Sequence, residues 1–233
     1  MPRVRVHLAR HGETAENRLR IFQGQLDTQL NEEGLTQARI LAEALKDVPF
    51  SLGFASDLSR AKKTASEVLR IHPNSVLTTD SRLRERFMGN LQGLEFTKER
   101  VRSIAKDDTI ESKEELSKRG IDWWKSTIIP LAIPQTRSGE NSIETVEVLA
   151  VSHGAFILTL LNSMLQEGLA TYAYQLPLAQ CLNTSISILE LESLEAPAVL
   201  VKHADIGHLL KPRVQEVVQD NVDDVAIGGS KSE

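Results

Sequence analysis

Two short apolar stretches that each end in His-Gly most constrain the fold of this chain. Val4 to Ala9 alternates apolar and polar residues and stops at Arg10-His11-Gly12, and the continuous apolar run Val148 to Val151 stops at Ser152-His153-Gly154. Both patterns predict strands, and the second is typical of a strand buried on both faces of a parallel sheet. Ligands bind at the carboxyl ends of such strands. We therefore expect both histidines at one sheet edge, in a site.

The rest of the chain alternates helical and strand patterns. Asn31 is expected to cap the first helix, and Ser56 with Asp57 the second. Helices are predicted over 31–45, 58–71 and 155–165, and strands over 4–9, 50–55, 76–79, 147–152, 184–190 and 198–203, the last two as a hairpin. We find no internal repeat and no clear interdomain linker, so one domain is expected over 1–219. The end, 220–233, is acidic and then rich in Gly and Ser, and is expected to be disordered.

Residues 87–145 depart from this alternation and are interpreted as a helical cap insert that covers a pocket. A basic run comes first, with Lys98, Arg100, Arg102 and Lys106, and a long helix is expected to follow, with Trp123 or Trp124 at helical spacing from leucines. The simplest interpretation of the basic run is a solvated helix face. The alternative is that one or two of its side chains bind a second phosphate or a carboxylate. The tryptophans are expected in the core.

Composition excludes several classes of function. The net charge of −5 and the pI near 5.8 argue against a general nucleic-acid or membrane-surface binder, so positive charge for an anionic substrate must be local. The single cysteine, Cys181, excludes an internal disulfide and a cysteine-built zinc site. His7 and His11 have a helical metal-pair spacing but lie in a predicted strand, so no metal is expected. Without a signal peptide or a spanning apolar run, we expect a cytoplasmic protein that could also enter the nucleus.

Two arginines and a glutamate are predicted to join the two histidines. Arg60 falls in the first turn of the helix that follows strand 50–55, where free backbone N–H groups and the helix dipole hold anions. Glu85 lies between Arg84 and Arg86. Three of the four segments that carry these residues follow a predicted strand, and parallel-sheet geometry brings such segments together. Arg10, which precedes the first histidine, completes the cluster.

In order and in residue type, these segments resemble the motifs of the histidine phosphatase superfamily, also called phosphoglycerate mutase-like. The resemblance extends from Val4 to His208, and within the superfamily the sequence looks most like the small phosphatases, which include fructose-2,6-bisphosphatase-type proteins and broad-specificity sugar phosphatases. It implies an α/β fold: a three-layer α/β/α sandwich with a mostly parallel central sheet and a helical cap. The matching motifs are Leu8-Ala9-Arg10-His11-Gly12-Glu13-Thr14 with Asn17, Gln23-Gly24, Ala55-Ser56-Asp57-Leu58-Ser59-Arg60-Ala61 with Thr64, Arg82-Leu83-Arg84-Glu85-Arg86 with Gly89 and Gly93, and Val151-Ser152-His153-Gly154.

The resemblance also implies a role for each site residue. His11 would attack phosphorus and form a phosphohistidine, and Glu85 would protonate the leaving alcohol and then activate water. Arg10, Arg60 and His153 would stabilise the charge on the phosphoryl oxygens. No metal or other cofactor is implied, and the expected partner is a small phosphorylated metabolite, a sugar phosphate or bisphosphate. The implied phosphate-binding set is Arg10, His11, Asn17, Gln23, Gly24, Arg60, Glu85, His153 and Gly154.

Two alternative functions stay open at this point. One is a cofactor-dependent phosphoglycerate mutase, and the other is a non-catalytic phosphate-binding module. The expected cap is shorter than in the mutases and lacks a glycine before Glu111-Ser112, so it favours water entry and a phosphatase. The presence of all five expected catalytic residues argues against the binding module. Because Arg84 and Arg86 favour the ionised form of Glu85, we expect activity shifted to acid pH.

Overall fold

The computed structural model describes residues 3–133, 145–174 and 178–210. The helices are α1 (Ala15–Arg18), α2 (Glu32–Ala44), α3 (Ser59–Leu69), α4 (Lys98–Ser103), α5 (Lys113–Trp123) and α6 (Gly154–Gln166); the strands are β1 (Val4–Arg10), β2 (Phe50–Ala55), β3 (Val76–Thr79), β4 (Val146–Ser152), β5 (Ala170–Tyr172), β6 (Ile186–Leu191) and β7 (Ala198–Asp205). The expected disordered end, 220–233, and the end of the cap insert, 134–144, lie outside the described residues. No helix within these described ranges is both long enough and apolar enough to span a membrane.

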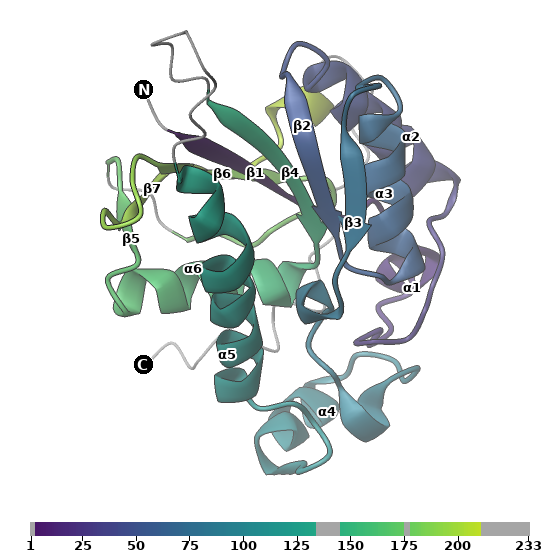
Figure 1. Ribbon diagram of the computed structural model, residues 1–233. Coiled ribbons are helices and arrows are strands. Elements are labelled where there is room, and N and C mark those ends of the chain that lie inside the picture. Colours follow the sequence, from purple (N-terminus) through teal and green to yellow (C-terminus); the bar gives the residue numbers. More distant parts are fainter. Residues whose placement is uncertain (1–2, 134–144, 175–177, 211–233) are drawn as a thin grey trace, which may run out of the picture.

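The strands form one seven-stranded sheet in the order β3-β2-β4-β1-β6-β7-β5 (Figure 1). It is parallel through β3, β2, β4 and β1, whereas β6 runs antiparallel to β1 and to β7. This arrangement confirms the mostly parallel sheet and the terminal hairpin. The register of β1 on β4 sets Arg10 beside Ser152, so the two strands that precede the histidines end level.

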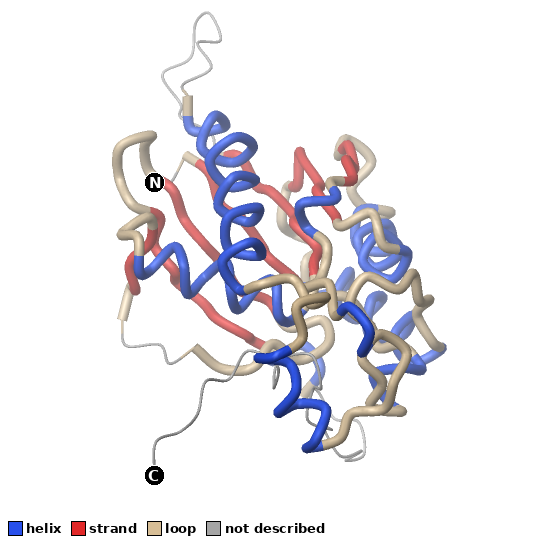
Figure 2. The backbone as a smooth tube through the Cα atoms, turned by 90° about the horizontal axis from the view of Figure 1, so that it is seen from below, coloured by secondary structure: helices blue, strands red, loops and turns tan. Residues whose placement is uncertain are grey.

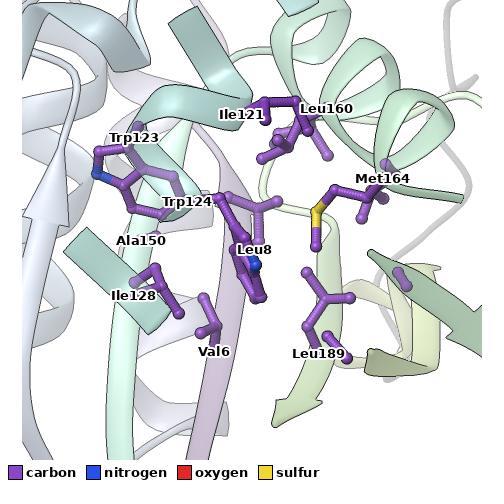
Figure 3. Packing of buried hydrophobic residues seen from close by; sticks show 14 of the residues in the cluster. Val6, Leu8, Ile121, Trp123, Trp124, Ile128, Ala150, Leu160, Met164 and Leu189 are labelled. Atoms are coloured by element: carbon purple, nitrogen blue, oxygen red, sulfur yellow. The ribbon is translucent and has the colours of Figure 1, made fainter. Parts of the chain in front are cut away.

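Helices cover both faces of the sheet, which confirms the three-layer α/β/α sandwich (Figure 1). Apolar residues of α2 and α3, such as Leu41 and Val68, are buried against one face, and those of α5 and α6 are buried against the other. Trp123 and Trp124 are fully buried beside Leu8 and Ile128, as expected of core residues (Figure 3). Each such large apolar side chain stabilises the fold by about 1.5–3 kcal/mol on burial.

The predicted N-cap residue is confirmed for α2 and is wrong for α3. Asn31 caps α2, with its Oδ1 accepting the Gly34 N–H at 2.7 Å. The prediction that Ser56 and Asp57 cap the next helix is wrong, because α3 begins after Leu58 and no side chain of its own N-cap is bonded. The Asp57 carboxylate is bonded to Arg84 instead. Asp27, from a distant loop, accepts the Ser59 N–H at 2.6 Å and its hydroxyl at 2.9 Å.

The segment between β3 and β4 leaves the sheet at its carboxyl edge and includes α4 and α5 (Figures 1 and 2). A π-helical turn, Trp124–Ile128, and a short 3-10 helix, Ile129–Ala132, extend α5 toward the sheet. Seen from below, helices and loops lie in front of part of the sheet (Figure 2). The side chains of Lys98, Arg102 and Lys106 are exposed, in agreement with a solvated helix face.

Candidate active site

His11 lies just past the end of β1 with its imidazole fixed by two neighbours. Its Nδ1 is 2.7 Å from the Gly12 carbonyl oxygen, which can only accept a hydrogen bond, so the proton is assigned to Nδ1. The Nε2 atom then carries the lone pair. Consistent with this assignment, Arg60 Nε donates to His11 Nε2 at 3.3 Å. The ring is 1 % exposed, and its nucleophilic nitrogen faces a guanidinium.

Arg60 is held by the loop that precedes α2. It lies in the first turn of α3, and its Nη2 donates to the Gly24 carbonyl at 2.8 Å while its Nη1 donates to the Leu26 carbonyl at 2.7 Å. Gly24 has a positive φ of 51°, a conformation that favours glycine. An added Cβ at Gly24 would also meet the Gln92 side chain. The loop and the helix therefore fix one guanidinium between them.

His153 lies just past the end of β4, at the N-cap of α6, and its ring is next to that of His11. The two ring centroids are 5.0 Å apart at an interplanar angle of 60°. His153 is fully buried, and neither ring nitrogen has a hydrogen-bond partner within the described part of the chain. Buried polar atoms are normally bonded, and exceptions call for an explanation. A phosphoryl oxygen between the two rings would accept a hydrogen bond from the protonated ring nitrogen of His153.

The Glu85 carboxylate lies at the N-terminus of α6. It accepts N–H groups from Ala155 at 3.1 Å and from Phe156 at 3.0 Å, in addition to the Arg86 N–H at 2.8 Å. These contacts satisfy backbone donors that every helix leaves open at its first turn. The Arg84 guanidinium, expected to act on Glu85, forms a two-fold ion pair with Asp57 at 2.6 and 2.7 Å.

The remaining predicted phosphate-binding residues differ in their surroundings. Arg10 is fully buried and its Nη1 donates to the Cys181 carbonyl at 2.9 Å. Gln23 is fully buried as well: its Oε1 accepts the Thr14 hydroxyl, and its Nε2 has no hydrogen-bond partner within the described residues. Asn17 is partly exposed, and its Oδ1 accepts the Thr14 backbone N–H. Gln23 thus keeps one buried amide donor without a hydrogen-bond partner in the part of the chain that the structure describes.

Burial and positive charge keep both histidines neutral. The pKa of His11 is well below its usual value because of burial first, and then because of Arg60 and Arg10. The pKa of His153 is lowered by burial, by Arg60 and by His11. A neutral imidazole is the nucleophilic form. Two buried, positively charged arginines also stabilise a phosphoryl group more strongly than they would in water.

Several contacts at the site had no signal in the sequence. Asn183 donates to the His11 carbonyl at 3.0 Å, and Gln25 and Arg119 donate to the Glu85 carbonyl at 3.1 and 2.9 Å. Gln25 and Arg119 also line a pocket of about 900 Å³ on the cap side, so this pocket adjoins the segment that carries Glu85. Among the described residues, no group of three or more His, Cys, Asp or Glu side chains is placed to hold a metal ion.

Comparison with known proteins identifies relatives over most of the chain. The histidine phosphatase superfamily (branch 1) pattern matches residues 6–203. A probable phosphatase of Schizosaccharomyces pombe is 28% identical to this chain, and the match covers 82% of this chain and 88% of the relative. A probable phosphoglycerate mutase of Yersinia pestis is 29% identical, and the match covers 92% of this chain and 99% of the relative. The structure of a mycobacterial glucosyl-3-phosphoglycerate phosphatase with inorganic phosphate superimposes with a TM-score of 0.68. It is 27% identical in sequence, and the match covers 88% of this chain and 99% of that chain.

Proposed function

This chain belongs to the histidine phosphatase superfamily, and from that membership we propose that it hydrolyses small phosphomonoesters, sugar phosphates or bisphosphates, through a phosphohistidine on His11. The observation that carries the proposal is the state of His11: its Nε2 is deprotonated, buried and next to Arg60, 3.3 Å away. A neutral imidazole beside a guanidinium suits attack on an anionic phosphoryl group, because the guanidinium offsets charge repulsion.

In the first step, His11 Nε2 forms a bond to phosphorus while the bond from phosphorus to the leaving oxygen breaks. Arg10, Arg60 and the single ring N–H of the neutral His153 stabilise the equatorial oxygens, which carry most of the charge of the transition state. Glu85 transfers its proton to the leaving oxygen, so the product leaves as a neutral alcohol. The phosphoryl group is then covalently bound to His11.

In the second step, water takes the place of the alcohol. Glu85, now a carboxylate, accepts a proton from the water, whose oxygen attacks phosphorus as the bond to Nε2 breaks. Inorganic phosphate leaves, and Glu85 is protonated again for the next cycle. The backbone N–H groups of Arg86, Ala155 and Phe156 hold its carboxylate in one place for both steps.

The cap favours hydrolysis over internal phosphoryl transfer. Between β3 and β4 the described residues form two α-helices, the short α4 and the longer α5, together with short 3-10 and π-helical turns. The relatives of this chain nevertheless include a probable phosphoglycerate mutase, so a mutase is the competing function. A mutase would retain the first product and return the phosphoryl group to it, and would need a bisphosphate to load His11.

Phosphate release from a panel of sugar phosphates and bisphosphates tests the proposal. We expect turnover of at least one member, and no turnover by His11→Ala, because the proposed phosphohistidine cannot form without the His11 imidazole. Acid-labile labelling of the wild-type chain by a ³²P-labelled substrate, absent in His11→Ala, would identify the phosphohistidine. Full activity of His11→Ala would show that the nucleophile is assigned wrongly. Conversion of 3-phosphoglycerate to 2-phosphoglycerate that requires bisphosphate priming, without phosphate release, would show a mutase.

A further inference from the structure

We propose that Arg119, together with Glu111, is a positioning residue that holds Glu85 in place for proton transfer. The inference rests on the proposed role of Glu85 as the acid. Glu85 lies in an irregular segment between a 3-10 turn, Ser81–Leu83, and the cap, outside the strands and helices of the described chain. Catalytic groups need to be held within a fraction of an ångström by their surroundings. The segment must therefore obtain much of its rigidity from side chains.

Arg119 supplies that rigidity through backbone carbonyls of the segment. From α5, its Nη1 donates to the carbonyls of Arg82 and Arg84 at 2.7 and 2.6 Å, and its Nη2 donates to the carbonyl of Glu85 at 2.9 Å. One planar fork thus binds three carbonyls within four residues of chain. A guanidinium has five donors in a rigid plane, whereas the lysine ammonium is a point charge on a flexible stem. Arginine is therefore the residue type this contact needs.

Glu111 fixes the guanidinium and binds the far end of the same segment. Its Oε1 accepts Arg119 Nε at 2.7 Å and its Oε2 accepts Nη2 at 3.0 Å. The same Oε2 accepts the Phe87 N–H at 3.0 Å, and the Glu111 N–H donates to the Phe87 carbonyl at 3.0 Å. Arg86 Nε donates to the Glu111 carbonyl at 2.7 Å. The segment 82–87 is bound on both sides of Glu85 by one ion pair.

Arg119 also contacts the helix that holds the Glu85 carboxylate. Its Cζ atom lies 5.4 Å from the centre of the Phe156 ring, within cation–π range. The Phe156 N–H donates to Glu85 Oε1 at 3.0 Å. The same guanidinium therefore touches the backbone that carries Glu85 and the residue whose amide holds its carboxylate. Loss of this contact should displace the acid relative to His11, and a displacement of about 1 Å can reduce a rate about 100-fold.

The test compares two substrates that differ in their need for an acid. An aryl phosphate with an activated leaving group departs without a proton, whereas an alkyl phosphate such as a sugar phosphate requires one. We expect Arg119→Lys and Glu111→Gln to reduce kcat for the alkyl phosphate by about 10- to 100-fold, with little change for the aryl phosphate. KM should change less than kcat. Glu85→Gln should show the same selective loss, to a greater extent.

Arg82→Lys is the matched control, because Arg82 ties the same segment to α5 without contacting Glu85. The Arg82 Nη1 atom donates to Asp122 at 2.6 Å and to Ser126 at 2.7 Å. The Arg82→Lys variant should leave the substrate preference unchanged. Thermal unfolding and aryl phosphatase activity establish that each variant is folded. An equal loss on both substrates, or no loss, in the Arg119 and Glu111 variants would overturn the inference while leaving the role of Glu85 intact. If Glu85→Gln itself shows no selective loss, the acid is assigned wrongly and the positioning role fails with it.

Discussion

At the scale of single residues, the site is defined by how burial and charge set the state of His11. Burial and the two nearby arginines lower its pKa well below the usual value of 6.5. The neutral form therefore persists at pH values at which an exposed histidine is already half protonated. The proposed nucleophile therefore does not need alkaline pH. The expected shift of activity to acid pH, which was argued from Glu85, stays a prediction.

We expect the acid limb of kcat/KM to lie below pH 6.5 for this reason. A profile between pH 5 and 8 with an aryl phosphate, corrected for the substrate's own ionisation near pH 6, measures the limb. Titration of ¹³C-labelled histidine by NMR, with His11→Gln to assign the signal, measures the imidazole directly. An imidazole pKa for His11 at or above 6.5, or a kcat/KM that falls steeply between pH 7.5 and 6.5, would contradict the expectation.

Residue identities at the centre of the site could be predicted, but their supports could not. His11, Arg60 and His153 stand next to strand or helix ends, and such local patterns are visible in the sequence. Arg119 acts through backbone carbonyls, which every residue has, so no pattern of residue types marks its partners. Gln25 donates to the Glu85 carbonyl and was missed for the same reason. Long-range contacts to the backbone can be found only once the fold is known.

At the scale of elements, the periodic helices and strands were predicted well, and the errors have local causes. β5 (Ala170–Tyr172) was missed because three residues are too few to establish a period. The predicted N-cap residue of α3 was wrong because Asp57 has a plausible position for a cap in the sequence, whereas in the fold its carboxylate pairs with Arg84. The group that takes its place, Asp27, lies in a loop more than thirty residues earlier in the chain.

Asp27→Ala should lower the free energy of unfolding by about 1 kcal/mol, the usual effect of losing a helix cap. The Ser59 N–H and hydroxyl would lose their acceptor, and the loop that carries Gly24 would lose an anchor near Arg60. Urea denaturation measures the change. Asp27→Asn retains one oxygen acceptor and should recover part of the stability. Asp47→Ala, at an exposed acid that caps no helix, should change stability by less than about 0.5 kcal/mol. Equal stability of Asp27→Ala and wild type would show that the contact does not stabilise α3.

At the scale of the whole molecule, histidine burial couples folding to pH. Five of the six histidines have a pKa lowered below 6.5, and burial is the largest cause for each; they are His11, His72, His153, His203 and His208. The unfolded chain therefore binds more protons than the folded one as pH falls below 6.5. Their stabilising contribution is fully present above pH 6.5 and decreases as pH falls toward the lowered values. The net charge of −5 is small, so overall repulsion opposes this trend only weakly.

We expect the free energy of unfolding to fall between pH 6.5 and 5 in a buffer without phosphate. Urea denaturation at half-unit pH steps measures it, and a single pKa unit of difference between folded and unfolded states corresponds to about 1.4 kcal/mol. The His11→Gln/His153→Gln double variant lacks the two fully buried imidazoles and should show a shallower decline, because fewer groups take up protons on unfolding. Aspartates and glutamates titrate mainly below this range, so they do not account for a loss that begins near pH 6.5. A stability that stays constant or rises on acidification would mean that these imidazoles titrate alike in both states, and that the site does not keep His11 and His153 neutral.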